Sequence, residues 1–254
     1  MPRLVALAIA LVALMGCTCN RSATPPPETP TVPAAAKAKP QPAQVSAAQR
    51  GAEGEDMPDS APVSPALLDP SQATDKAPDT YTVKLDTTAG EVLIDVTRSW
   101  SPKGADRFYN LVKLGYYDGS HIFRVISGFM AQMGLSPHPK VNAVWSEANI
   151  GDDPVTQSNT RAMVSFATRG PNTRTTQFFI NFGNNAGLDG QGFSPFGKVR
   201  DMKTVDAFYA DYGEGAPAGN GPSQGRIHRD GGAYLDKDFP KLDKIKKATI
   251  VDPA

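Results

Sequence analysis

Alternating apolar and polar residues first appear at Tyr81. The segment 81–85 alternates as a half-buried strand does, and 91–96 repeats the pattern after a turn-like sequence at 87–90. These two segments predict an antiparallel hairpin. Further strand-like patterns occur at 122–133, 163–167, 177–182 and 196–199, and a closing strand is expected at 248–251.

Helical spacing of apolar residues is found in two segments. Ser101 and Pro102 suit the N-cap and the first helical position, and Gly115 suits the end of that helix. A second helix is expected over 202–213. The segment 214–238 is rich in glycine and polar residues and predicts a long loop. Many strands with only two helices favour a closed or nearly closed antiparallel barrel.

The stretch from Thr18 to Thr80 has a different composition. It holds twelve of the chain's 23 prolines and contains no Phe, Trp, Tyr or Ile. Such a segment buries too little apolar surface to offset the entropy of ordering it. We therefore predict a disordered tether over 17–79, followed by one folded domain over 80–254. A proline-rich ligand for a partner is the alternative interpretation of the tether.

The N-terminus is typical of an export signal. Arg3 precedes an apolar run, 4–15, that is too short to span a bilayer comfortably. The run leads into Leu-Met-Gly-Cys at 14–17, which resembles the lipobox of bacterial lipoproteins. This resemblance implies a signal peptide over 1–16, a lipid on Cys17 and anchoring in the cell envelope. Thr18 after the cysteine favours the outer membrane, facing the periplasm. An ordinary cleaved secretory signal is the alternative.

Charge and composition exclude several function classes. Lys plus Arg and Asp plus Glu are both 26, so nothing in the net charge indicates a nucleic-acid partner. Cys17 and Cys19 precede the predicted domain, which therefore has no disulfide. His121, His138 and His228 lack metal-ligand spacing. Neither a Gly-x-Ser-x-Gly nucleophile motif nor a phosphate-binding glycine loop stands out, and no metal or cofactor is predicted.

Two of the predicted strands carry polar residues among apolar ones. Arg124 is surrounded in sequence by apolar residues, and a charge buried there needs an ion-pair partner or a catalytic role to offset the cost of its burial. A structural ion pair within the sheet is one explanation, and catalysis is the other. Phe179 lies between Gln177 and Asn181 on a mixed face that suits a binding groove. The opposite face is wholly apolar and is expected in the core.

These strands belong to three blocks that resemble the cyclophilin family of peptidyl-prolyl cis-trans isomerases. The blocks are Phe123-Arg124-Val125-Ile126 through Gly128-Phe129-Met130 to Gln132; Gly170-Pro171-Asn172-Thr173 with Gln177-Phe178-Phe179-Ile180; and Leu188-Asp189-Gly190 with Phe196-Gly197-Lys198-Val199. Their order and spacing agree with the family from about residue 80 to about 200. The resemblance implies a closed eight-stranded antiparallel barrel capped by two helices. It also implies a monomer that acts on X-Pro bonds without a cofactor.

The resemblance further implies which residues act. Arg124 matches the catalytic arginine, whose donor hydrogen bond stabilises the twisted amide. The peptide-binding groove is expected to comprise Phe123, Phe129, Met130, Gln132, Ala167, Thr168, Gln177, Phe179 and Leu188. Phe123 stands where many cyclophilins have histidine, and Gly187 stands where drug-sensitive members have tryptophan. The insertions 136–159 and 214–238 have no role that the resemblance assigns.

Two rival functions remain. A cyclophilin-like binding module or holdase chaperone would share the groove but need no turnover. A purely structural envelope lipoprotein would not explain a groove lined with these residue types. The expected partners are proline-containing segments of unfolded or exported proteins, together with a membrane reached through the lipid anchor.

Overall fold

The computed structural model describes residues 63–251. Contacts divide the chain into two units, Met1–Gly54 and Glu55–Ala254, and the described residues all belong to the second. The predicted signal peptide, the lipidation site Cys17 and the tether up to residue 62 lie outside the described residues. Within 63–251, no helix combines the length and the apolar character that crossing a membrane requires.

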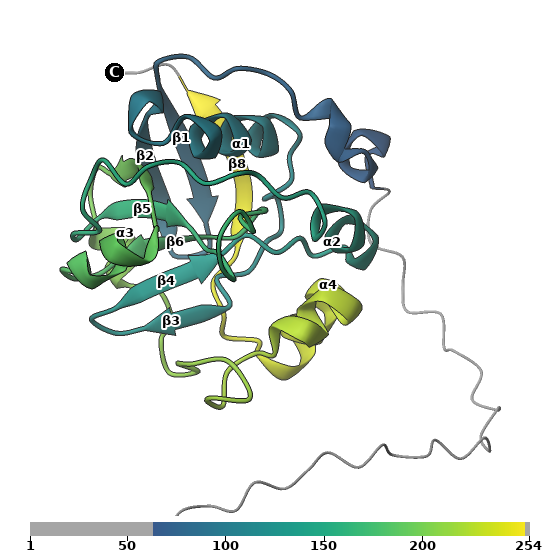
Figure 1. Ribbon diagram of the computed structural model, residues 1–254. Coiled ribbons are helices and arrows are strands. Elements are labelled where there is room, and N and C mark those ends of the chain that lie inside the picture. The colour runs from purple at the N-terminus through teal and green to yellow at the C-terminus, as the bar shows by residue number, and fades with distance from the viewer. Residues whose placement is uncertain (1–62, 252–254) are drawn as a thin grey trace, which may run out of the picture. The chain divides into compact units, whose positions relative to one another are not determined.

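One eight-stranded sheet forms the centre of the domain (Figure 1). Its strands are β1 Thr80–Thr87, β2 Gly90–Thr97, β3 Arg124–Ile126, β4 Met130–Met133, β5 Met163–Phe166, β6 Phe178–Asn181, β7 Pro195–Val199 and β8 Ile245–Val251. The order across the sheet is β3-β4-β6-β5-β7-β2-β1-β8, and every neighbouring pair is antiparallel. The predicted antiparallel fold with eight strands is thereby confirmed.

The two edges of the sheet approach each other just before β3 and at the start of β8. His121 and Lys244 form an antiparallel bridge, and the amide of Ile122 donates to the carbonyl oxygen of Asp243 at 2.8 Å. The sheet therefore curls on itself, and a short bridge rather than a full ladder joins its edges.

Helices cover the sheet in a way that the sequence predicted only in part. They are α1 Pro102–Lys113, α2 Pro139–Trp145, α3 Lys203–Asp206 and α4 Gln224–Asp238, with 3-10 segments η1 Pro65–Leu68, η2 Pro70–Gln72, η3 Arg98–Trp100 and η4 Ala186–Gln191. The first predicted helix is confirmed as α1. The second is wrong, since only the single turn α3 forms within 202–213.

The longest helix, α4, lies within the segment that was predicted to be a loop. Ile227, Tyr234 and Leu235 are buried on it and pack with Phe123, Leu135 and Leu242 in a second hydrophobic cluster. Gly231 has φ of +65°, a conformation that side chains avoid, and it kinks the helix in the middle. Glycines occupy positions 231 and 232 of the buried face, where a helical pattern would have apolar side chains, so the segment has the composition of a loop.

The predicted domain boundary at residue 80 is also wrong, because 63–79 fold onto the domain. Leu67 and Ala77 are buried in the main core. The side-chain amide of Asn110 donates to the carbonyl oxygen of Asp75 at 2.7 Å. A few apolar anchors and hydrogen bonds are enough to order this proline-rich stretch, although its composition resembles that of a tether.

The main core lies between the concave sheet and α1. Phe108 of α1 packs its ring against those of Phe178 and Phe196, with centroids 5.2 and 4.9 Å apart. Both belong to apolar strand faces, β6 and β7, so the prediction that the apolar face of 177–182 is core is confirmed. This core fixes β4 and β6, the two strands that carry most of the groove.

Candidate active site

A groove of about 500 Å³ opens beside β4 and β6. It is lined by every residue that the sequence predicted for the site except Phe123: Arg124, Phe129, Met130, Gln132, Ala167, Thr168, Gln177, Phe179 and Leu188. Residues from well-separated parts of the chain meet here because β4 pairs with both β3 and β6.

The apolar end of the groove is formed by aromatic and aliphatic side chains. Phe179 on β6 and Met130 at the start of β4 are almost fully buried. Phe193, which the sequence did not single out, packs edge-on against Phe179 with ring centroids 5.6 Å apart. Together with Phe129 and Leu188 they form an apolar pocket that excludes water from one part of the groove.

A chain of polar side chains crosses the groove next to this pocket. Arg124 lies opposite Gln132 in the register of β3 and β4. Nη1 of Arg124 donates to Oε1 of Gln132 at 2.8 Å, and Nε2 of Gln132 donates to Oε1 of Gln177 at 2.8 Å. Because Arg124 can only donate, it fixes the orientation of the Gln132 amide, which in turn fixes that of Gln177.

The sequence did not identify the second partner of Arg124, which is Glu214. Nε and Nη2 of Arg124 donate to Oε1 and Oε2 of Glu214, each at 2.6 Å. The hydrogen bond from Arg124 lowers the pKa of Glu214 below its ordinary value. The two residues lie 90 positions apart, and no local pattern announces such a pair. Arg124 thus has both an ion-pair partner and a place in the groove.

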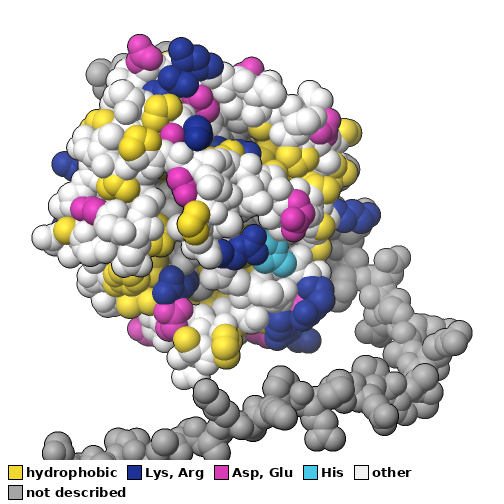
Figure 2. All heavy atoms as spheres, viewed as in Figure 1, with side chains coloured by type: hydrophobic (Ala, Val, Ile, Leu, Met, Phe, Trp, Pro, Cys, Tyr) yellow, Lys and Arg dark blue, Asp and Glu magenta, His cyan; other side chains and the backbone are white. Residues whose placement is uncertain are grey.

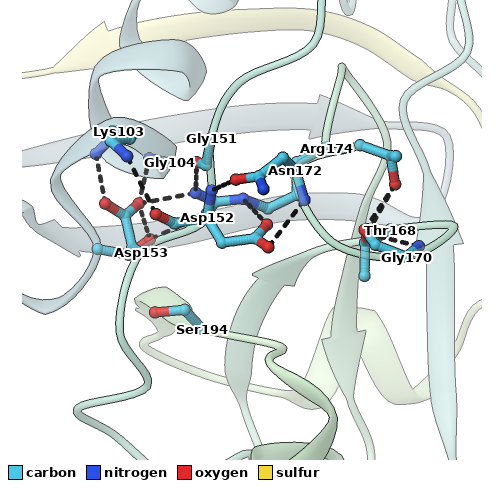
Figure 3. Close-up of polar contacts among 12 residues, drawn as sticks. Lys103, Gly104, Gly151, Asp152, Asp153, Thr168, Gly170, Asn172, Arg174 and Ser194 are labelled. Carbon is cyan, nitrogen blue, oxygen red and sulfur yellow. Dashed lines mark hydrogen bonds and ion pairs between the residues drawn. The ribbon is translucent and has the colours of Figure 1, made fainter.

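Ala167 and Thr168 form the rim of the groove and continue into a tight loop. The amide of Ala167 donates to the carbonyl oxygen of Gln177 at 2.9 Å. The hydroxyls of Thr168 and Thr173 lie 2.9 Å apart, and both side chains also bond the carbonyl oxygen of Gly170, as Figure 3 shows for Thr168. The hydroxyls of Thr168 and Thr173 therefore stabilise the predicted turn at 170–173.

A cluster of charged side chains, formed by Asp152, Asp153 and Arg174, lies beside this loop (Figure 3). Nη2 of Arg174 donates to Oδ2 of Asp153 at 3.0 Å, and both side chains are almost fully buried. Asp152 and Asn172 exchange hydrogen bonds of 2.9 and 2.8 Å through their main-chain amides and side-chain oxygens. The insertion 136–159, which supplies both aspartates, thereby supports the rim of the groove.

The same cluster caps α1 in a way that differs from the prediction. Ser101 stands at the N-cap position, but its side chain makes no cap bond and instead donates to Oδ2 of Asp153 at 2.7 Å. That carboxylate accepts from the amide of Gly104 at 2.9 Å. Burial raises the pKa of Asp153, but the hydrogen bonds from Ser101 and Gly104 and the charge of Arg174 outweigh it, so the net shift is downward.

The other insertion contributes a wall of the groove. Gln224, Gly225 and His228 on α4 line it, facing a part that also includes Arg169 and Thr173. Burial lowers the pKa of His228, and the nearby charge of Arg169 lowers it further. In Figure 2 a Lys or Arg side chain and a histidine side chain lie next to each other near the middle of the visible face. No sequence pattern predicted this wall, because the segment that forms α4 was expected to be a loop.

Phe123 is the one predicted groove residue that the structure places elsewhere. It is fully buried beside Leu135 and under α4, and it does not line the groove. Neighbouring residues of an extended segment point to opposite faces, so Phe123 and Arg124 cannot both face the groove. Within 63–251, no three His, Cys, Asp or Glu side chains are grouped as ligands for a metal.

Comparison with known proteins agrees with this geometry. The family model of the cyclophilin type peptidyl-prolyl cis-trans isomerases matches residues 82–217. The peptidyl-prolyl cis-trans isomerase-like 3 of Neurospora crassa is 38% identical over 125 residues, which are 46% of this chain and 74% of that protein. The isomerase cyp18 of Streptomyces antibioticus is 31% identical over 132 residues, which are 49% of this chain and 80% of that protein.

Solved structures show the same fold. A cyclophilin type peptidyl-prolyl cis-trans isomerase of Cryptosporidium parvum superposes with a TM-score of 0.51 at 22% identity, covering 69% of this chain and 99% of that one. The sheet and the sequence matches together define an isomerase of prolyl peptide bonds. The chain belongs to the cyclophilin-type peptidyl-prolyl cis-trans isomerase family.

Proposed function

We propose that the protein isomerises X-Pro bonds in segments of exported proteins, with Arg124 as the catalytic residue. The observation that carries this proposal is that Arg124, bonded to Gln132, lies in the same groove as the apolar pocket around Phe129 and Phe179. A proline ring has the size and apolar character to occupy such a pocket, which would bring the preceding amide toward the guanidinium.

The chemistry asked of Arg124 follows from the amide bond itself. Rotation about an X-Pro bond destroys amide resonance and meets a barrier of about 20 kcal/mol. In the twisted state the prolyl nitrogen becomes pyramidal and regains a lone pair. A charged donor aimed at that nitrogen binds the twisted state better than either planar form, which is the condition for catalysis. No covalent bond is formed or broken, so no cofactor is called for.

The other residues of the groove bind the peptide on either side of the isomerising bond. Gln132 and Gln177 present side-chain amides whose orientations are fixed by Arg124, and Ala167 and Thr168 offer a rim for the peptide backbone. One of the Cryptosporidium parvum structures with this fold was determined in the presence of the dipeptide Ala-Pro. That observation supports a proline-containing peptide as the ligand of this groove.

The proposal that the clients are exported proteins rests on the N-terminal sequence. The lipobox-like sequence at 14–17 supports a lipid on Cys17 and a place at the outer membrane, facing the periplasm, where the isomerase would assist folding as a monomer. Cys17→Ser should move the protein from the membrane fraction to the soluble fraction. Equal membrane association of variant and parent would overturn the anchor.

The catalytic assignment is tested with Arg124→Ala and an Ala-Pro tetrapeptide in a coupled isomerisation assay. Losing a preorganised charged donor should lower kcat/KM by about 100- to 1000-fold. Peptide affinity should change little, because the bond to the prolyl nitrogen forms chiefly in the twisted state. Arg124→Lys should recover only part of the activity, since an ammonium cannot reproduce the planar fork. A folded Arg124→Ala variant with parental turnover would refute this role.

The same assay separates the enzyme from a binding module or holdase. The parent should accelerate isomerisation of the tetrapeptide at substoichiometric concentration. A parent that binds the peptide but does not accelerate its isomerisation would instead be a binding module, because a groove that holds planar and twisted forms equally cannot catalyse.

A further inference from the structure

The pairing of Arg124 with Glu214 leaves a specific part of the guanidinium unoccupied. A guanidinium carries five N–H groups in a rigid fork. Glu214 accepts from Nε and Nη2, and Gln132 accepts from Nη1. Among the described residues these bonds use three of the five groups. Of the remaining two, the one on Nη2 points away from Glu214 at the far end of the fork, where it can meet a substrate, and the other is on Nη1 beside the bond to Gln132.

Glu214 itself is held by its own loop. The amide of Gly215 donates to Oε1 of Glu214 at 2.8 Å, and the carbonyl oxygen of Glu214 accepts from the amide of Gly221 at 2.8 Å. A Cβ added at Gly221 would lie only 2.8 Å from that carbonyl oxygen, so the loop needs glycine there to close against Glu214. The carboxylate is therefore placed by the backbone around it and not by Arg124 alone.

We propose that Glu214 is a positioning residue, which holds the guanidinium of Arg124 by its inner edge so that the far end of the fork faces the prolyl nitrogen. The inference rests on the proposed catalytic role of Arg124. An arginine side chain has several rotatable bonds, and a donor stabilises a transition state best when its direction is fixed beforehand. Gln132 alone restrains one corner of the fork, whereas two bonds to a carboxylate restrain its plane.

The geometry argues against a role in which Glu214 blocks the groove. Its two oxygens occupy the edge formed by Nε and Nη2, and they leave the far end open. Glu214 is also absent from the lining of the groove, while Arg124 and Gln132 are part of it. A peptide can therefore reach Arg124 without displacing the carboxylate.

The first measurement compares variants at position 214 by kcat and KM on an Ala-Pro tetrapeptide. Glu214→Ala should lower kcat about 10- to 100-fold, the size expected when a reacting group is misplaced. KM should change by less than about 3-fold, since the residue does not line the groove. Glu214→Gln should also lose activity, because its NH₂ would face an N–H of Arg124. Glu214→Asp retains a carboxylate and should recover part of the loss.

A double-mutant cycle then asks whether Glu214 acts through Arg124. Turnover is measured by NMR exchange spectroscopy at high enzyme concentration, so that the slow Arg124→Ala background remains measurable. In that background Glu214→Ala should change the rate by less than about 2-fold, because a residue that works through Arg124 has nothing left to position. An equal loss in both backgrounds would overturn the inference.

Glu91→Ala is the matched control. It removes a glutamate from an exposed ion pair with Lys84 on the β1–β2 hairpin, outside the groove, and should leave both kcat and the melting temperature unchanged. Parental or raised activity of folded Glu214→Ala, alongside an inactive Arg124→Ala, would refute the positioning role and leave the catalytic role standing. A fully active Arg124→Ala variant would instead refute the catalytic role of Arg124, on which the inference about Glu214 rests.

Discussion

The indole Nε1 of Trp145 donates a 2.8 Å hydrogen bond to the main-chain carbonyl oxygen of Leu67. Trp145 lies on α2, inside an insertion, and Leu67 lies in η1, inside the stretch whose composition resembles a tether. Both residues are buried, so the bond ties into the main core a segment that was predicted to be a disordered tether and an insertion to which the sequence assigned no role. The proline-rich stretch therefore ends in a structural segment of the domain.

Removing that segment should destabilise the domain. Deletion of 20–78 exposes the surface that Leu67 and Ala77 cover and removes the partner of Trp145, which we expect to cost about 2 to 4 kcal/mol. The melting temperature should fall by roughly 5 to 12 °C for a domain of this size. Deletion of 20–62 should leave it unchanged. Differential scanning calorimetry of the two deletions measures whether the melting temperature depends on residues 63–78.

A pair of adjacent leucines provides a control for this prediction. Leu67 is 8% exposed and Leu68 is 40% exposed. Leu67→Ala should lower the melting temperature, while Leu68→Ala should not, because only the first removes buried apolar surface. Equal melting temperatures for the parent, Leu67→Ala and the deletion of 20–78 would show that the segment contributes nothing to stability.

Cyclosporin should inhibit this isomerase weakly. By resemblance, the drug-sensitive members offer it a tryptophan at the position of Gly187. A Cβ added at Gly187 meets no atom within 4 Å, so a larger side chain has room there. Gly187→Trp should therefore tighten inhibition by about 10-fold or more, as expected when a large aromatic anchor is restored at an interface. Nanomolar inhibition of the parent would contradict this prediction.

Stability should fall in two stages as the pH is lowered. Burial lowers the pKa of His121, His138 and His228, so the folded state binds fewer protons than the unfolded chain below about pH 6.5. Stability is therefore lost as the pH falls through that range. Asp153 and Glu214 have lowered pKa values, and the stability they contribute is lost only below about pH 4.

Thermal melts from pH 8 to pH 3 measure both stages. His121→Gln keeps a group that can bond to Asp236 but cannot titrate, so it should flatten the fall between pH 6.5 and 5 and leave the acid stage in place. A melting temperature that stays constant or rises between pH 6.5 and 5 would contradict the assignment of the first stage to histidines.

Most of the groove could be predicted because three blocks of the sequence resemble the cyclophilin family, and that resemblance assigns the groove positions residue by residue. The structure adds the physical reason why these positions meet: Arg124 pairs with Gln132 and Gln132 pairs with Phe179 across neighbouring strands, and these pairs fix the centre of the site. The misassignment of Phe123 came from carrying over a neighbouring position without applying the same alternation of faces.

What the sequence could not predict depends on distant contacts. Glu214 reaches Arg124 across 90 positions from a glycine-rich loop, and nothing in its neighbourhood marks it as a partner. His228 lines the groove from α4, whose neighbouring residue Ile227 packs in the cluster with Phe123, more than 100 positions earlier in the chain. Each of these features results from packing between segments that carry no shared pattern.

The buried pair of Arg174 and Asp153 should matter both for stability and for the groove. Asp153→Ala leaves the guanidinium of Arg174 buried without its closest carboxylate, which typically costs about 3 to 5 kcal/mol. It also removes the acceptor for the amide of Gly104 at the start of α1. We therefore expect a clear fall in the melting temperature and a raised KM for the tetrapeptide, because the loop with Thr168 and Thr173 lines the groove.

A second pair of variants separates the two effects. Asp86→Ala breaks an exposed ion pair with Lys246 and should change the melting temperature by no more than about 3 °C, since exposed pairs contribute about 1 kcal/mol or less. Asp152→Ala removes the acceptor for the amide of Asn172 but leaves Asp153 beside Arg174. It should raise KM with a smaller loss of stability, because it loosens the loop without orphaning a buried charge. Unchanged KM in both Asp152→Ala and Asp153→Ala would show that the cluster holds the fold together but does not shape the rim where the peptide binds.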